Sequence, residues 1–244
     1  MNKENSAPEL SIVFPCLNEE ASLARCLSAA RRTCQQAGVS FELVVADNGS
    51  TDKSIEIARA EGARVVPVKQ KGYGSALHHG ILAAQGTYVA FCDADGSYPV
   101  EFFAEMWKQI KQEQVDLLLA NRLIAPMEKN AMPFLNRYAG TPVLSALIRL
   151  LFSFPVHDCN SGMRIIRRDK YEALGLKHTG MAYASEMLCA AAIKGLSYKE
   201  CPMSHFSKDS RGGRPPQLNR WRDGWAHLCV IIKMFWESKK EGKK

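Results

Sequence analysis

One short run constrains the fold of this chain more than any other: Tyr88-Val-Ala-Phe-Cys-Asp-Ala-Asp95, an apolar segment that stops at two carboxylates. A buried strand does not tolerate unpaired charges, so Asp93 and Asp95 belong at its carboxyl end. Side chains alternate along a strand, so the two carboxylates converge only where the chain bends, and Gly96 supplies such a bend. Convergent carboxylates form half of a divalent-cation site, completed by phosphate oxygens and water. A solvated Asp-Ala-Asp-Gly turn is the alternative interpretation.

Strand-like and helix-like segments alternate from Leu10 onward. The pattern predicts strands at 11–15, 41–46, 63–68, 87–92 and 116–120, with helices between them. Such alternation is typical of βαβ units and predicts an α/β fold with a mainly parallel, Rossmann-like sheet flanked by helices. Ligands bind beyond the carboxyl ends of the strands in sheets of this kind. The polar residues that follow the strands are therefore expected to face one crevice: Asn18, Asp47, Lys71-Gly72, Asp93 and Asp95.

The glycine pattern narrows the kind of nucleotide site that this crevice suggests. A nicotinamide dehydrogenase carries GxGxxG after its first strand, whereas that turn here is Pro15-Cys-Leu-Asn-Glu-Glu20, and the chain contains no GxxxxGK[ST] sequence. An acidic crevice does not neutralise a pyrophosphate by itself, so a metal held by Asp93 and Asp95 has to do so. These residues favour a metal–nucleotide site over a dinucleotide fold.

Composition limits the partners. With 244 residues, 46% of them hydrophobic, the chain can build one sizeable core, and its formal charge of +7 suggests an anionic partner.

Eight cysteines without a CxxC pair predict small buried thiols rather than disulfides or zinc ligands. The polar start, Met1 to Glu9, does not resemble a signal peptide, and no apolar run reaches the ~18–20 residues that span a bilayer. We expect a soluble protein or one that sits on a membrane surface.

At this point the motifs resemble a known family. The segments Ser-Ile-Val-Phe-Pro-Cys-Leu-Asn-Glu-Glu20, Val-Val-Ala-Asp-Asn-Gly-Ser-Thr-Asp52, Lys-Gly-Tyr-Gly74 and Asp-Ala-Asp95 look like the signatures of family 2 glycosyltransferases with the GT-A fold. Downstream, Asp158-Cys-Asn-Ser-Gly-Met-Arg164, Ala184-Ser-Glu-Met-Leu188 and the segment from His205 to Gly213 resemble the polyprenyl- and dolichyl-phosphate sugar synthases. The resemblance covers about residues 10–230. It is specific for fold and reaction class and less so for sugar and acceptor.

The resemblance implies roles for the donor side of the crevice. Asp47 is expected to hydrogen-bond the base or ribose, Asp93 to face the ribose or metal, and Asp95 to hold Mg²⁺ or Mn²⁺ against the diphosphate of a UDP- or GDP-sugar. Arg122 matches the family's strand-end arginine near the sugar or phosphate. The other expected donor-binding residues are Pro15, Asn18, Glu19, Lys71, Gly72 and Ala94.

On the acceptor side, Arg164 and Arg211 match basic residues that hold phosphates, and Glu186 matches an acidic residue that orients the acceptor or acts as a base. Plainer interpretations stay open: Asp47 and Asp52 cap a helix, or Glu186 only stabilises a helix N-terminus.

The chain also departs from the family in two places. Arg214 stands where a lysine usually follows, although a guanidinium and an ammonium are not interchangeable. Gly96 stands where dolichyl-phosphate mannose synthases often carry a polar residue.

Two segments have the pattern of amphipathic helices. An apolar stripe follows the Pro215-Pro216 break, and lysines flank it and follow it to the C-terminus. A second apolar helix is expected over 143–154, with Thr141 as a cap and a polar stripe of Ser145, Arg149 and Ser153. Both helices can simply pack on the catalytic domain, but tryptophans beside lysines suit an anionic membrane surface. The predicted stripe consists of Leu218, Trp221, Trp225, Leu228, Cys229, Ile232, Phe235 and Trp236.

We therefore expect a flexible N-terminus over 1–9, a GT-A catalytic domain over 10–216, and an amphipathic helix with a basic tail over 217–244. The resemblance implies an inverting, metal-dependent hexosyltransferase that acts on polyprenyl phosphate, peripheral on the inner face of the cytoplasmic membrane. One alternative is a family 2 glycosyltransferase with another lipid, glycan or hydroxyl acceptor. Another is a nonenzymatic nucleotide- or nucleic-acid-binding module, which Asp93 and Asp95 oppose because carboxylates repel a phosphate backbone; we expect no nucleic-acid partner.

Overall fold

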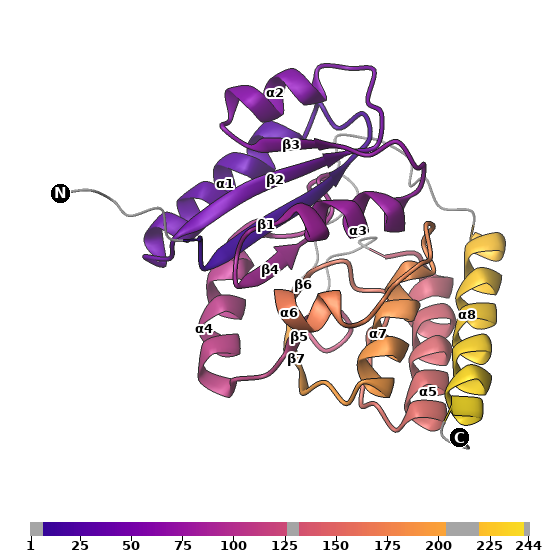
Figure 1. Ribbon diagram of the computed structural model, residues 1–244. Helices are drawn as coiled ribbons and strands as arrows, with labels where there is room; N and C mark the ends of the chain where they lie inside the picture. The colour runs from indigo at the N-terminus through magenta and orange to yellow at the C-terminus, as the bar shows by residue number, and fades with distance from the viewer. Residues whose placement is uncertain (1–6, 126–131, 204–219, 242–244) are drawn as a thin grey trace.

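A computed structural model describes residues 7–125, 132–203 and 220–241. Seven strands form one sheet in the order β3-β2-β1-β4-β6-β5-β7 (Figure 1). Every paired neighbour is parallel except β6, which runs antiparallel to both β4 and β5. The predicted α/β fold with a mainly parallel sheet is confirmed. The strands are β1 (Leu10–Cys16), β2 (Phe41–Asp47), β3 (Arg64–Pro67), β4 (Tyr88–Phe91), β5 (Leu117–Asn121), β6 (Arg164–Arg167) and β7 (Tyr198–Pro202).

Helices cover both faces of the sheet, and each face has its own apolar core. On one side, side chains of α1 and α4 such as Leu27 and Met106 pack against the sheet. On the other side α3, α5, α7 and α8 contribute Leu77, Ile148, Leu188 and Ile231. The helices are α1 (Leu23–Gln36), α2 (Ser54–Ala60), α3 (Tyr73–Ala83), α4 (Phe103–Glu113), α5 (Thr141–Phe152), α6 (Arg168–Glu172), α7 (Tyr183–Ile193) and α8 (Arg220–Glu241), with the short turns η1 (Val100–Phe102) and η2 (Asn136–Gly140).

The five predicted strands are all present, and the sequence interpretation missed two. The strand β6 has four residues bounded by Arg164 and Arg167, so its two buried isoleucines do not form a recognisable apolar run. The strand β7 lies at the edge of the sheet, and its Lys199 and Glu200 are typical of an edge strand that mixes charge with apolar residues. These two strands extend the sheet by pairing around β5.

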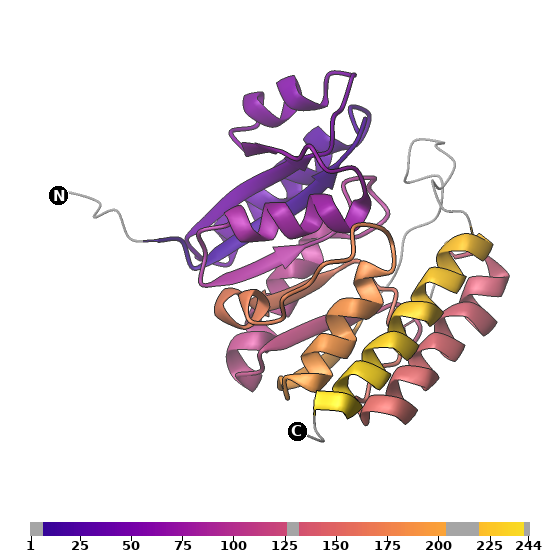
Figure 2. The same cartoon turned by 45° about the vertical axis from the view of Figure 1, so that its right-hand side comes forward.

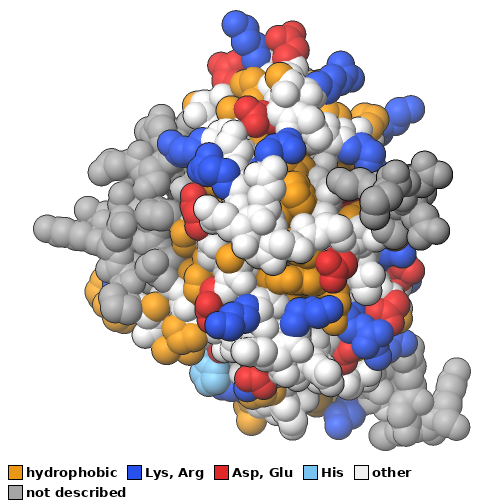
Figure 3. All heavy atoms as spheres, turned by 90° about the vertical axis from the view of Figure 1, so that its left-hand side faces the viewer, with side chains coloured by type: hydrophobic (Ala, Val, Ile, Leu, Met, Phe, Trp, Pro, Cys, Tyr) orange, Lys and Arg blue, Asp and Glu red, His pale blue; other side chains and the backbone are white. Residues whose placement is uncertain are grey.

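The helices α5, α7 and α8 pack together. Figures 1 and 2 show α5 and α8 side by side, with α7 next to α8, and the contacts between these elements agree. No helix among the described residues is long and apolar enough to cross a bilayer. All eight cysteines are free and seven are buried, as expected for small apolar thiols. On the face drawn in Figure 3, basic and acidic side chains lie interspersed rather than in one basic patch.

Candidate active site

The carboxyl ends of β1 and β2 are tied together by Asn18. Its backbone is left-handed, with φ of 59°. This conformation is uncommon outside glycine but accessible to asparagine. The side chain Oδ1 accepts a hydrogen bond from the backbone N of Thr51 at 2.7 Å, and the Asn18 backbone N donates to Ser50 Oγ at 2.9 Å. Next to it, the Glu19 backbone N donates to Ser54 Oγ at 2.8 Å. The predicted nucleoside-side loop is therefore held rigidly against the loop after β2.

Asp47, the last residue of β2, is buried, and its carboxylate closes the turn that follows it. Oδ2 accepts from the Gly49 backbone N at 3.0 Å and Oδ1 from the Ser50 backbone N at 3.1 Å. Asp52 bonds nearer to the helix: its Oδ1 accepts from the backbone N of Ser54, the first residue of α2, at 2.9 Å. Asp52 therefore bonds to the first residue of α2 from just before its N-cap, Lys53, while Asp47 shapes the turn.

The Lys71-Gly72-Tyr73-Gly74 segment fits tightly between two other loops. Asn48 holds it, accepting from the Gly72 backbone N at 2.8 Å through Oδ1 and from Lys71 Nζ at 2.6 Å through its carbonyl. Gly72 has φ of 130°, and a Cβ there would collide with the carbonyl of Thr179. A Cβ on Gly74 would lie 2.6 Å from the carbonyl oxygen of His178. These glycines therefore allow a close backbone approach.

The two carboxylates after β4 take up the predicted bend. Gly96 has φ of 76°, a region that favours glycine, and Asp95 Oδ1 accepts from the Ser97 backbone N at 2.8 Å. Asp93 Oδ1 accepts from the hydroxyl of Tyr73 at 2.7 Å. Both carboxylates are partly exposed, and Ala94 between them is buried. Hard oxygen donors of this kind suit Mg²⁺ or Mn²⁺.

A metal bound here would need ligands from elsewhere. Across the described ranges, no group of three or more His, Cys, Asp or Glu side chains is placed to hold a metal ion. That Asp93 and Asp95 bind a cation whose coordination is completed by substrate oxygens and water stays a prediction.

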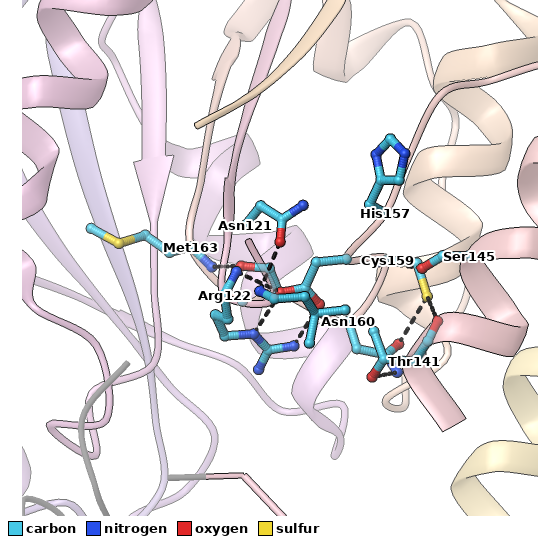
Figure 4. A network of polar contacts seen from close by, with 12 residues as sticks. Asn121, Arg122, Thr141, Ser145, His157, Cys159, Asn160 and Met163 are labelled. Atoms are coloured by element: carbon cyan, nitrogen blue, oxygen red, sulfur yellow. Dashed lines mark hydrogen bonds and ion pairs between the residues drawn. The ribbon is translucent and has the colours of Figure 1, made fainter. Parts of the chain in front are cut away.

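Arg122 forms a buried ion pair at the end of β5 (Figure 4). Its Nε and Nη2 donate to the two carboxylate oxygens of Asp158 at 2.8 and 2.7 Å, and its Nη1 donates to the Tyr98 hydroxyl at 3.2 Å. Burial raises the pKa of Tyr98 to about 12, so the phenol stays neutral. Glu200 of β7 fixes the loop that carries Asp158, because its Oε1 accepts from the backbone N of His157 at 2.8 Å and of Asp158 at 3.2 Å.

Arg164 differs from the predicted phosphate-gripping residue. Its guanidinium is buried, and it donates to the carbonyl oxygens of Ser161 and Cys159 at 3.0 Å and of Ala184 at 3.1 Å. Those hydrogen bonds link β6 to the start of α7. Among the described residues no carboxylate forms a salt bridge with Arg164. Its grip on a phosphate stays a prediction, but most of its donors serve the protein backbone.

Glu186 also bonds to the backbone. Its Oε1 accepts from the backbone N of Lys177 at 3.0 Å and its Oε2 from that of His178 at 2.8 Å. The carboxylate lies in the first turn of α7, as the plainer interpretation expected, and it holds the loop against which Gly72 and Gly74 pack. The predicted residues Arg211 and Arg214 lie outside the described residues.

A cavity of about 210 Å³ extends from the carboxylate end of the crevice toward the C-terminal helices. Tyr73, Asp93 and Arg122 line one part of it, and Arg164 lies in its wall. Thr141 and Leu144 of α5, and Asp223 and His227 of α8, line the part formed by the helices. The predicted nucleoside-side residues Pro15, Asn18, Glu19 and Asp47 are not among its lining. The cavity therefore lies next to Asp93, away from the residues that are predicted to border the nucleoside.

The family model described as "Glycosyl transferase family 2" matches residues 11–175. The chain belongs to glycosyl transferase family 2. The low-salt glycan biosynthesis hexosyltransferase Agl6 of Haloferax volcanii is 34% identical over 93% of this chain, which spans 54% of that relative's length. The dolichyl-phosphate hexose transferase of the same organism is 31% identical over 97% of this chain and 98% of its own length.

Solved structures agree on the fold. Glucosyl-3-phosphoglycerate synthase from Mycobacterium tuberculosis gives a TM-score of 0.72 at 21% identity, over 93% of this chain and 80% of that one. The same enzyme in complex with Mn²⁺, uridine diphosphate and glucosyl-3-phosphoglycerate gives a TM-score of 0.71. At this identity the likeness shows the GT-A fold alone.

Several residues of this family 2 glycosyltransferase escaped the sequence interpretation. Asp158 lies within a motif that was noticed, but only the structure pairs it with Arg122, 36 positions away. Tyr73 lies within the Lys-Gly-Tyr-Gly74 segment that was noticed, but no role was predicted for it, and Tyr98 gave no signal of its own. His227 is separated by 42 positions from Ser185, to which it bonds. The one sequence signal for His227 is that it lies among apolar residues at helical spacing.

Proposed function

We propose that this chain transfers a hexose from a nucleotide diphosphate sugar, UDP- or GDP-linked, to a polyprenyl phosphate, with inversion and with Mg²⁺ or Mn²⁺. One observation carries the proposal: the cavity that begins at Asp93 is walled by η2, α5 and α8, and the outer faces of those elements carry exposed apolar side chains. The full-length similarity to a dolichyl-phosphate hexose transferase and the similarity to an undecaprenyl-phosphate sugar transferase support it.

On the donor side, Pro15, Asn18, Glu19 and Asp47 would border the nucleoside. Lys71, Gly72 and Ala94 belong to the same rim in this proposal. When bound, the metal neutralises charge that develops on the diphosphate leaving group. The carboxylates of Asp93 and Asp95 would hold it, and the hydrogen bonds from Tyr73 and Ser97 fix how those carboxylates are oriented.

The state of Glu186 favours a phosphate acceptor over a hydroxyl acceptor. A hydroxyl has to lose a proton during transfer, which calls for a general base within hydrogen-bond reach. Both carboxylate oxygens of Glu186 already accept hydrogen bonds from backbone N–H groups, at 3.0 and 2.8 Å. A lipid phosphate is anionic at neutral pH and needs no base, so the proposed reaction does not depend on Glu186 as a proton acceptor.

The helix α5 exposes apolar side chains on its outer side, while Leu144 and Ile148 on its inner side pack into the core. Val143 and Leu150, seven residues apart on one helix face, are 62% and 79% exposed. Two members of the predicted polar stripe bond to the protein: Ser145 Oγ accepts from the Cys159 backbone N at 3.0 Å, and Arg149 Nη1 donates to the Val156 carbonyl at 2.7 Å. The third, Ser153, is exposed and follows the end of the helix. Exposed apolar patches on a soluble fold mark an interaction surface.

The helix α8 has two apolar faces. Ile231 is buried, and Leu228 and Met234 pack against the core. Trp225, Ile232 and Trp236 lie at helical spacing on the outer face and are 68%, 41% and 61% exposed. Of the predicted stripe, Leu218 and the side chain of Trp221 lie outside the described part. Exposed Lys233, Lys239 and Lys240 accompany the outer face, which suits an anionic leaflet.

In this proposal residues 10–216 form the catalytic domain, and residues 217–244 bind the inner face of the cytoplasmic membrane while α8 also closes the cavity. The segment 1–9, which the sequence predicts to be flexible, has no role in it. A polyprenyl phosphate would then present its head group to the cavity while its chain stays in the leaflet. Phe134, Leu135 and Tyr138, exposed around η2, extend the apolar surface next to Pro133 and Asn136 of the cavity lining.

The acceptor is tested by comparing lipid and soluble phosphates. With the nucleotide sugar that binds best and with Mn²⁺, we expect transfer to a polyprenyl phosphate and none to 3-phosphoglycerate or to the matching polyprenol. Product formation is followed by thin-layer chromatography of labelled sugar. Transfer to the polyprenol or to 3-phosphoglycerate, with none to polyprenyl phosphate, would favour the alternative of another acceptor.

The proposed membrane-binding surface is tested by placing a negative charge on the outer face of α5 or of α8. Leu150→Glu and Trp236→Glu are each expected to weaken binding to anionic vesicles at least about tenfold, because burying a large apolar side chain contributes about 1.5–3 kcal/mol. Leu82→Glu on α3, where Leu82 is 46% exposed, is the matched control. Flotation at low salt measures the binding. A wild-type chain that does not float, or equal losses in the control, contradicts the assignment.

A further inference from the structure

The helix α8 lies outside the segment that the family model matches, yet two of its polar side chains line the cavity. Asp223 and His227 are four residues apart, so they project from one face of the helix. His227 is 6% exposed, and in the described structure its Nε2 makes no hydrogen bond to the protein. A buried polar group without a protein partner at a cavity wall indicates that a ligand or water completes its hydrogen bonding.

The tautomer of His227 follows from its neighbour. Nδ1 lies 2.8 Å from Ser185 Oγ, and Ser185 is fully buried on α7. A buried hydroxyl hydrogen needs an acceptor, and within the described residues Nδ1 is the one that Ser185 Oγ contacts. Ser185 therefore donates to Nδ1, and the ring proton lies on Nε2. Burial, together with the charges of His178 and Arg164, lowers the pKa of His227 to about 4, so the ring is neutral near pH 7.

On its helix side the cavity suits an uncharged ligand better than a phosphate, because both arginines of the cavity wall are already engaged by protein groups. The guanidinium of Arg122 is engaged by Asp158 and Tyr98, and that of Arg164 by three backbone carbonyls. The helix side of the cavity instead offers one carboxylate and one neutral imidazole. The carboxylate accepts hydrogen bonds and repels an anion, and the imidazole N–H donates one. This combination suits a neutral ring that carries hydroxyl groups.

The position and size of the cavity agree with that chemistry. It starts at Asp93, where the diphosphate and metal of the proposed donor would lie, and none of the nucleoside-side residues line it. Its volume of about 210 Å³ is below the roughly 300–1,000 Å³ of pockets that enclose drug-sized ligands. Tyr73, Tyr98 and Tyr183 give it aromatic walls. A single sugar ring attached to the diphosphate fits these limits.

We propose that the cavity holds the hexose of the nucleotide sugar and that Asp223 and His227 of α8 select the sugar by hydrogen bonds to its hydroxyl groups. This rests on the proposed function for the donor, but it is independent of which acceptor the enzyme uses. Asp223 accepts from two hydroxyls, and His227 Nε2–H donates to a third oxygen. The C-terminal helix therefore has a role in sugar specificity in addition to its outer apolar face.

Titration calorimetry without an acceptor tests this on the full chain with Mn²⁺. UDP-glucose, UDP-galactose and GDP-mannose are compared first, and the tightest is used together with its free nucleoside diphosphate. Asp223→Asn and His227→Gln are each expected to raise the Kd of the nucleotide sugar about tenfold or more, since each removes or weakens a hydrogen bond to a hydroxyl group of the sugar. The Kd of the free diphosphate is expected to stay within about twofold, because the nucleoside end lies outside the cavity.

Glu237→Gln is the matched control, because Glu237 is an exposed acid on the same helix that pairs with Lys233 at 3.8 Å. It should change neither Kd. If His227→Gln lowers Tm, its Kd is not interpreted, because the change has disturbed the fold. Asp223 is partly exposed, so Asp223→Asn then decides the test. An unchanged Kd for the nucleotide sugar in Asp223→Asn, or an equal rise for sugar and free diphosphate, overturns the assignment. A wild-type chain that binds none of the three nucleotide sugars overturns the proposed function itself, which is a different result.

Discussion

Replacing Asp95 by asparagine is expected to lower kcat by about 10³-fold or more while the fold and Tm stay close to those of the wild type. A bound metal stabilises the leaving diphosphate by several kcal/mol, and each 1.36 kcal/mol corresponds to about a tenfold change in rate. Asparagine keeps the Oδ1 that accepts from the Ser97 backbone N at 2.8 Å. It also removes one of two neighbouring like charges, which does not destabilise the free protein.

Steady-state transfer with Mn²⁺ or Mg²⁺ in excess measures this effect. Asp169→Asn is the matched control, because Asp169 forms an exposed ion pair with Arg167 at 2.9 Å, away from the cavity. That variant should keep wild-type turnover. Full activity in EDTA, or an Asp95→Asn variant that turns over like the control, would contradict a metal-assisted reaction at this site.

The sheet could be predicted wherever a buried apolar run ended in polar residues. The strands β1, β2, β4 and β5 have this form, and the half-buried β3 contains the valine pair Val65-Val66. Each of the five was placed within a few residues of its observed bounds. The strands β6 and β7 lack it, because β6 has only two isoleucines between two arginines and β7 has one buried residue, Cys201, beside Lys199 and Glu200. Their stability comes from pairing with β5, a contact between distant parts of the chain that a local pattern does not contain.

The position of Asn18, Asp47 and Asp93 could be predicted for the same reason: all three lie at strand ends, which the strand order brings to one edge of the sheet. That they bind the donor stays a prediction. The roles of individual side chains were harder to predict. Arg164 and Glu186 have the charges that phosphate binding and catalysis need, yet both bond to backbone groups. Which partner a charged side chain takes depends on burial and on loops distant in sequence, so residue type alone did not decide it.

The Arg122–Asp158 pair offers the largest expected effect on stability. The Asp158 side chain is fully buried and that of Arg122 is 10% exposed, with 2.7 Å between Nη2 and Oδ1. Asp158→Asn leaves a buried guanidinium without its counter-charge, which costs about 3–5 kcal/mol. Urea unfolding should show a lower midpoint with an unchanged m-value. The exposed-pair control Asp169→Asn should lose less than about 1 kcal/mol.

A double variant separates the charge from the packing. Arg122→Met/Asp158→Leu removes both charges from the same buried space, and replacing a buried pair by apolar residues is often neutral for stability. We therefore expect it to be more stable than Asp158→Asn and still inactive, because Arg122 lines the cavity beside Asp93. If both variants are equally unstable, the loss comes from packing around Tyr98 and Glu200. If the double variant recovers stability without activity, the loss in Asp158→Asn comes from the uncompensated charge of Arg122, and the reaction needs Arg122 itself.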